Sequence, residues 1–238
     1  MKNTSFKPVK SRQTVQDQVY DQLRKALVSG AFEAGQGFTI PALAKSFGTS
    51  HMPVREALRR LAAENALKIS STGTAIVPPL EMRELTKICE ARMILEPATA
   101  EIAFDNLTAS DMAELRANLL RHKETGETGD VVEMLAVNRA FHFHIYAAAD
   151  NDVLFGQIEN LWLRSGPYVR FLSEKMGELL RGSYKTGYTA HHEAMLAAWE
   201  AGDKAAFTQA MSEDVRATRD LLLTFLDEEL SANAEAAD

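Results

Sequence analysis

The spacing of apolar residues in the first eighty positions predicts three helices followed by a hairpin. Apolar side chains recur every three or four positions along residues 14–29. A short helix is expected over residues 40–47, and a third helix begins at Ser50, a residue type favoured at helix N-caps. Residues 67–79 alternate around a Ser-Ser-Thr-Gly centre, which indicates a two-stranded hairpin.

This order of elements is typical of a winged helix-turn-helix domain, in which the third helix lies in the DNA major groove. Residues near its start should face base edges. Arg55 is the best candidate, because a bidentate arginine–guanine contact is the commonest specific pairing. Neighbouring polar side chains should hold phosphates. A helix with ordinary solvated arginines is the alternative. The predicted DNA-binding residues are Lys45, Ser50, His51, Met52, Arg55, Arg59, Thr72, Gly73 and Thr74.

The rest of the chain reads as helix, with no convincing strand. We therefore predict a mostly α protein: a winged helix-turn-helix domain over residues 1–79, an all-α antiparallel helical bundle over residues 80–230, and a disordered tail over residues 231–238. The expected helices of the bundle span about 80–105, 109–124, 130–149, 152–164, 185–201 and 203–229.

The charge distribution separates the same two parts. Residues 1–80 carry 11 Lys and Arg against 5 Asp and Glu, a net of +6, whereas residues 81–238 carry 15 against 28, a net of −13. The formal net charge of −7 thus hides a basic module joined to an acidic one. Phosphate attraction depends on the local field, so the acidic total does not exclude DNA binding.

Polar residues interrupt the inward stripes of several predicted bundle helices. Asn138 and His142 lie one turn apart on such a stripe, and His192, Asp214 and Arg92 occupy inward positions on three other helices. Each would destabilise an apolar interior if unpaired, so we expect them to converge. Two imidazoles, an amide oxygen and a carboxylate suit a divalent metal, zinc foremost, with nickel or manganese as alternatives.

The N-terminal motifs resemble a known family. The segments VYDQLRKALVSGAF and LAKSFGTSHMPVREALRRL, followed by Gly73, are similar to the DNA-binding domain of GntR-family bacterial transcription regulators over residues 14–78. The resemblance implies a dimer that binds a palindromic operator on double-stranded DNA. Many relatives have an arginine where this chain has His51.

The C-terminal motifs RMILEP, NRAFHFHIYAAADN and HHEAMLAAWEAGD resemble the ligand-binding FCD domain of the FadR subfamily, in particular its VanR-like branch, over residues 82–227. The usual ligands there, one Asp and three His, fall on Asn138, His142, His192 and Asp214. Asn138 lacks a carboxylate and Asp214 supplies one, so a bound divalent cation would leave a net charge of about +1. The family's effectors are mostly small carboxylates, and the resemblance assigns effector contacts to Arg92 and Tyr188.

These observations favour a cytoplasmic transcription regulator, expected from the family to be a repressor, with no catalytic residues. A single cysteine excludes an internal disulfide framework, no apolar run is long enough to span a membrane, and no signal peptide is expected. Two alternatives stay open. The bundle could be a plain dimerisation module with a satisfied polar core, or His142, His192 and Asp214 could form the two-histidine, one-carboxylate set of a non-haem iron enzyme.

Overall fold

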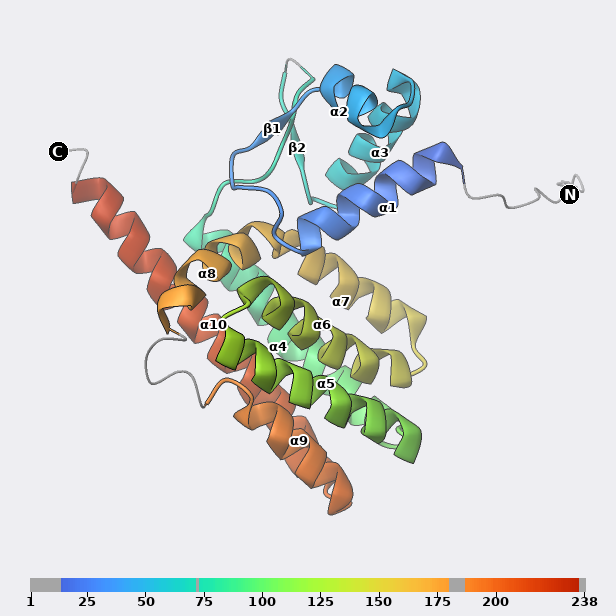
Figure 1. Cartoon of the computed structure of the whole chain (residues 1–238), viewed down its shortest axis with the longest axis vertical. Helices are drawn as coiled ribbons and strands as arrows, with labels where there is room; N and C mark the ends of the chain where they lie inside the picture. The colour runs from blue at the N-terminus through green and yellow to red at the C-terminus, as the bar shows by residue number, and fades with distance from the viewer. Residues whose placement is uncertain (1–13, 72, 180–186, 236–238) are drawn as a thin grey trace, which may run out of the picture.

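The N-terminal part of the chain forms three helices and a small sheet. The computed structural model describes residues 14–71, 73–179 and 187–235. The helices and the sheet form one unit at the top of Figure 1. In chain order its elements are α1 (Val15–Val28), β1 (Gly37–Phe38), α2 (Ile40–Phe47), α3 (His51–Ala63), β2 (Lys68–Ile69) and β3 (Ala75–Ile76).

Local sequence signals account for the helix boundaries of this unit. Thr14 and Asp17 form a reciprocal capping box at the start of α1, which satisfies backbone donors that have no partner within the helix. Thr39 caps α2, and Gly48 ends it in the left-handed conformation that glycine adopts without steric cost. The turn into α3 is therefore tight, and the predicted helix-turn-helix arrangement is confirmed.

The sheet contains one strand more than the sequence predicted. Its strand order is β1-β3-β2, all antiparallel, with Phe38 opposite Ala75 and Ile69 opposite Ala75 on the other side. The hairpin of β2 and β3 is the expected wing. Strand β1 was missed because it is two residues long and forms only through pairing with β3, far along the chain.

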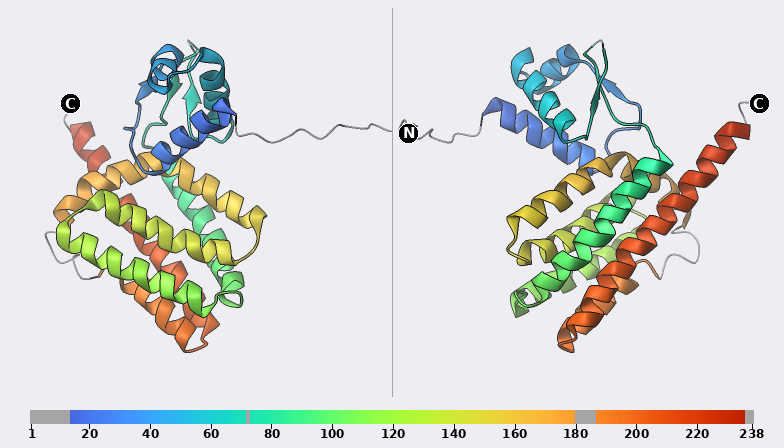
Figure 2. Two further views of the ribbon diagram at one scale, coloured as in Figure 1. Left: turned by 45° about the vertical axis from the view of Figure 1, so that its right-hand side comes forward. Right: turned by 180° about the vertical axis from the view of Figure 1, so that it is seen from behind.

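The second unit is the predicted helical bundle. In Figure 2, α4 and α10 run side by side, and the end of α10 projects beyond the other helices. None of the helices in the described ranges is long and apolar enough to cross a membrane. The elements are α4 (Met82–Phe104), α5 (Ala109–Thr128), α6 (Val131–Ala148), α7 (Asp152–Arg164), α8 (Gly166–Leu179), α9 (Ala190–Glu200) and α10 (Lys204–Glu235).

Two expectations about these helices were wrong. Helix α8 was not predicted, because Gly166 and Pro167 read as a break, yet proline is favoured in a first helical turn where its missing N–H has no partner to lose. Helix α10 continues through residues 231–235, where we expected a disordered tail, because the added residues include two alanines, which have the highest helix propensity. Residues 236–238 lie outside the described ranges.

The two units are packed closely against each other. Leu163 of α7 is 1% exposed and belongs to the hydrophobic core of the N-terminal unit. A Cβ atom placed on Gly166 would overlap the carbonyl oxygen of Leu27, so the end of α1 lies directly on the start of α8. Arg24 pairs with Glu159 at 3.1 Å across the same seam. Figure 1 shows the C-terminal end of α1 at the α7–α8 junction.

This contact predicts opposite effects for two glycine substitutions. Gly166→Ala should lower the melting temperature, by an amount corresponding to roughly 1–3 kcal/mol, because the added methyl group must displace Leu27. Gly156→Ala, in α7, meets no atom within 4 Å and should stabilise the protein by about 0.4–1 kcal/mol. Thermal unfolding of both variants checks this, and equal stability of the two would contradict the tight seam.

Candidate functional site

The start of α3 and the wing form one groove. His51, Arg55 and Arg59 line it together with Gly73 and Thr74 of the wing. Thus the structure brings together five of the nine residues predicted to contact DNA. Arg55 has no hydrogen-bond or ion-pair partner within the described residues, whereas Arg59 pairs with Glu56 at 2.8 Å.

The other predicted DNA-binding residues lie on or near the same surface. Met52 is 57% exposed, and Lys45 and Ser50 are exposed at the end of α2 and the start of α3. The Ser50 side chain makes no capping hydrogen bond, so its hydroxyl group is available to a phosphate. Thr72 lies outside the described residues.

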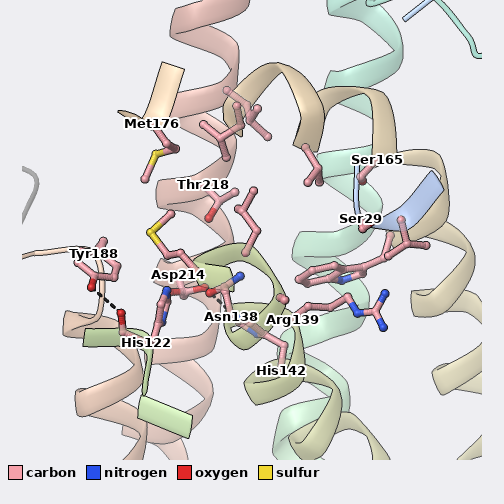
Figure 3. A pocket seen from close by; sticks show the side chains of 18 of the residues that line it. Ser29, His122, Asn138, Arg139, His142, Ser165, Met176, Tyr188, Asp214 and Thr218 are labelled. Carbon is pink, nitrogen blue, oxygen red and sulfur yellow. Dashed lines mark hydrogen bonds and ion pairs between the residues drawn. The ribbon is translucent and has the colours of Figure 1, made fainter. Parts of the chain in front are cut away.

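Three of the four predicted metal ligands meet inside the bundle. His142 Nε2 lies 3.1 Å from Asp214 Oδ2 and 3.2 Å from His192 Nε2, and His192 Nε2 lies 3.6 Å from Asp214 Oδ1. Both histidines are buried and Asp214 is only 9% exposed. Asn138, the fourth predicted ligand, is half-buried and, with His142 and Asp214, lines a cavity in the bundle (Figure 3).

These distances fit a single divalent ion. Ligand atoms at roughly 2.1 Å from a tetrahedral zinc ion are about 3.4 Å apart, and the three measured separations are close to that value. Burial acts to raise the pKa of Asp214, but the adjacent His192 and His142 rings hold that pKa below its usual range. Asp214 is thus ionised and able to coordinate.

A buried hydrogen-bond chain sets the tautomer of His142. Tyr146 donates its hydroxyl proton to Glu96 Oε2 at 2.6 Å, and the Tyr146 oxygen lies 3.1 Å from His142 Nδ1. Because Tyr146 has a single hydroxyl proton, His142 must donate from Nδ1. Its Nε2 lone pair therefore points toward Asp214 and His192, the arrangement that a metal-binding imidazole requires.

His122 of α5 is a site residue that sequence reasoning missed. Its Nδ1 atom lies 3.4 Å from His192 Nδ1, so one ring donates to the other. Burial lowers the pKa of His122 to about 4 and that of His192 to about 3, which keeps both rings neutral near pH 7. The signal was present, because His122 follows Leu115 and Leu119 on the inward stripe of residues 109–124.

The two predicted effector contacts line the cavity but have partners within the protein. Arg92 binds Glu96 through Nε at 2.6 Å and Nη2 at 3.3 Å, and its guanidinium lies 4.4 Å from the Trp162 ring centroid. Tyr188 donates a hydrogen bond of 2.6 Å to the backbone carbonyl of His122. Both side chains are thereby held in place at the cavity wall.

The cavity itself is large and carries more basic than acidic side chains. Its volume is about 900 Å³, near the upper end of the roughly 300–1,000 Å³ typical of small-molecule sites. Its charged lining residues are Lys25, Arg92, Arg139 and Asp214. Arg139, which the sequence analysis overlooked, is half-buried and has no ion pair among the described residues; burial lowers its pKa. The lining therefore favours an anion.

The neutral histidines predict a pH-dependent stability of the metal-free protein. An unfolded imidazole titrates near pH 6.5, so between about pH 6.5 and 4 the unfolded chain binds protons that the folded chain does not. The free energy of unfolding should be fully retained above pH 6.5 and fall as the pH drops through this range. His122→Gln should reduce this slope by up to about 1.4 kcal/mol per pH unit. Denaturant unfolding with a chelator present measures it, and an unchanged slope would contradict a buried neutral His122.

Comparison with known proteins identifies two families. Residues 15–77 match the model of bacterial regulatory proteins of the gntR family, and residues 87–217 match the FCD domain. The HTH-type transcriptional regulator McbR of Escherichia coli K12 is 34% identical over 196 residues, which cover 82% of this chain and 87% of McbR. The gluconate operon transcriptional repressor of Bacillus subtilis is 27% identical over 200 residues, 81% of this chain and 79% of that protein.

The solved structure of E. coli McbR/YncC has the same fold, with a TM-score of 0.82 and 32% sequence identity over 90% of this chain and 99% of that one. These relatives are transcription regulators, which excludes the metalloenzyme reading of His142, His192 and Asp214. The chain belongs to the GntR family, with an FCD domain as its helical unit, and is a transcription regulator rather than an enzyme.

Proposed function

We propose that this protein is a cytoplasmic, effector-controlled repressor. A homodimer binds a palindromic operator, and a small carboxylate that occupies the bundle cavity beside a divalent metal ion changes that binding. The observation that carries the proposal is the cavity itself. Its wall includes His142 and Asp214, whose donor atoms lie with that of the buried His192 within 4.8 Å of one another, and it also includes residues of α1 in the DNA-binding unit.

The DNA-binding half rests on the groove between α3 and the wing. Residues 1–79 would form the DNA-binding domain and residues 80–230 the effector-binding domain. The protein would belong to the VanR-like branch of the FadR subfamily. Arg55 is unpaired within the described residues and faces the groove, so it is placed to read a base. The name of the gluconate operon transcriptional repressor supports repression rather than activation.

The metal-binding part of the proposal depends on the type and position of the side chains in the histidine cluster. His142, His192 and Asp214 would hold the ion, and Asn138 is the candidate for a fourth ligand. Zinc fits best, because two imidazoles and a carboxylate are common zinc ligands. When bound, the ion would supply a fixed positive charge that attracts an anionic effector. Tyr146 and His122 would hold the two imidazoles in the tautomers needed for coordination.

A plain dimerisation bundle is the competing function. Such a bundle would fill its interior, since protein cores contain few voids larger than a water molecule. A cavity of about 900 Å³ lined by Arg139 and Asp214 is instead what a ligand-binding domain requires.

If Arg55 recognises a base, its removal should reduce operator affinity and affect sequence preference at one base pair only. Arg55→Ala should weaken binding to an operator selected from random DNA by about 1–3 kcal/mol and relax the preference at one base pair of each half-site. Fluorescence anisotropy at fixed salt measures this. Arg83→Ala, an exposed arginine in α4, is the matched control. Uniform weakening across all operator variants would instead assign Arg55 to a phosphate.

If the effector acts through the histidine cluster, a substitution there should leave operator binding intact and remove the response to the effector. His142→Ala should bind the operator as the wild type does but fail to respond to carboxylates. In the wild type, an acid at about a hundred times its Kd should stabilise the protein by roughly 2.7 kcal/mol, and a chelator should reduce this shift. Thermal unfolding and operator release measure both effects.

His144→Ala is the control for the same experiment, because His144 pairs with Asp111 at 3.0 Å away from the cavity. If a carboxylate released the operator equally well from the His142→Ala variant and from the wild type, the proposed coupling between the histidine cluster and DNA binding would be refuted.

A further inference from the structure

The cavity extends beyond the bundle to the DNA-binding unit. Lys25, Ala26, Val28 and Ser29, at the end of α1, line it together with Arg139 of α6 and Ser165 of the α7–α8 junction. Figure 3 shows Ser29 and Ser165 on the side of the pocket opposite Tyr188 and His122. The wall of this cavity is therefore shared by both units.

Two basic residues without an ion-pair partner among the described residues, Lys25 and Arg139, lie in this part of the cavity wall. The guanidinium of Arg92 is neutralised by Glu96, whereas neither Lys25 nor Arg139 has an ion pair in the described ranges. Glu159, a carboxylate at the seam, is paired with Arg24 at 3.1 Å. A half-buried guanidinium and an exposed ammonium in the same cavity wall form a site for a carboxylate, because an anion compensates for the hydration that the guanidinium has lost and is attracted by both charges.

We infer that the cavity takes an elongated dicarboxylate. One carboxylate lies at the His142, His192 and Asp214 cluster, and the other lies between Arg139 of the bundle and Lys25 of the DNA-binding unit. The inference rests on the proposed function for the first carboxylate and adds the second anion subsite. The volume of about 900 Å³ leaves room for a molecule longer than a small monocarboxylate.

This arrangement gives the ligand a direct means of regulation. Lys25 belongs to the wall only while α1 is packed on α8, at the Leu27–Gly166 contact. A ligand that touches both units therefore binds the packed arrangement more tightly than a separated one, and differential affinity is what shifts such an equilibrium. The dicarboxylate thus holds the DNA-binding unit in one orientation relative to the bundle.

The test compares α,ω-dicarboxylates of three to eight carbons with monocarboxylates of the same length. Binding is followed on the metal-loaded full-length protein by thermal unfolding and by intrinsic tryptophan fluorescence, to which Trp162 of the cavity wall contributes. At the best length, the wild type should bind the dicarboxylate roughly tenfold more tightly than the monocarboxylate, the effect of about 1.4 kcal/mol.

Lys25→Gln should abolish this preference without changing monocarboxylate affinity, a discrimination that a merely structural role would not produce. Arg139→Gln should do the same, and Lys87→Gln, an exposed lysine of α4 outside the cavity, should retain the preference. Because the Lys25 side chain is exposed, its variant is expected to fold.

The outcomes separate this inference from the proposed function. Equal affinity of the wild type for both acids, or an unchanged preference in Lys25→Gln, would overturn the second subsite alone. If no acid of either series binds, the carboxylate proposal and this inference both fail. Loss of the preference in Lys25→Gln with monocarboxylate binding intact supports the inference.

Discussion

The buried carboxylate of Glu96 is the contact on which the site depends. It is 0% exposed and accepts hydrogen bonds from Arg92, from Tyr146 at 2.6 Å and from Trp162 Nε1 at 2.9 Å. These partners come from α4, α6 and α7, so a single charge ties three helices together. A buried ion that loses a partner is strongly destabilised, and for that reason the three side chains are fixed relative to one another. The fixed hydroxyl of Tyr146 then sets the orientation of the His142 ring.

The same constraint extends across the bundle to helices that Glu96 does not touch. His142 faces Asp214 of α10 and His192 of α9, and His192 in turn contacts His122 of α5. Both ring nitrogens of His142 and of His192, and Nδ1 of His122, have a polar partner, which limits each of these atoms to a role as donor or acceptor. Low effective dielectric makes such a network stiff when fully satisfied. The anion that we propose as ligand would therefore meet side chains whose orientations are already fixed.

Helical periodicity explains what the sequence revealed about the site. His142, His192, Asp214 and Arg92 break apolar stripes, and a polar residue on an inward stripe must lie in the interior. His122 obeys the same rule and could have been found. Arg139 could not, because it lies off the stripe and faces a cavity whose existence depends on how the helices pack.

Contacts between distant segments were likewise hidden from the sequence. Strand β1 exists only as the partner of β3, and the role of Lys25 as a cavity residue depends on the docking of α1 against α8. Pattern analysis finds helices and their inward faces, but it does not show which helix of one unit covers an opening in another. The docking of α1 on α8 depends on the contact between the backbone carbonyl of Leu27 and Gly166, which has no side chain. Neither feature produces a periodic pattern in the sequence.

The strength of the seam determines whether a ligand can control it. Arg24–Glu159 is about a quarter to a third exposed, and Arg170–Glu33 is 3.9 Å long and more exposed, so these ion pairs contribute little and are screened by salt. Packing of Leu163 and Leu27 in one hydrophobic core, and the hydrogen bond of 3.1 Å from Asn160 to the backbone carbonyl of Glu64, hold the units together in addition to these pairs. Burying one leucine is worth about 1.5–3 kcal/mol. A ligand that bound only the packed arrangement would contribute roughly 2.7 kcal/mol at a hundred times its Kd, which is comparable to the burial of one such leucine.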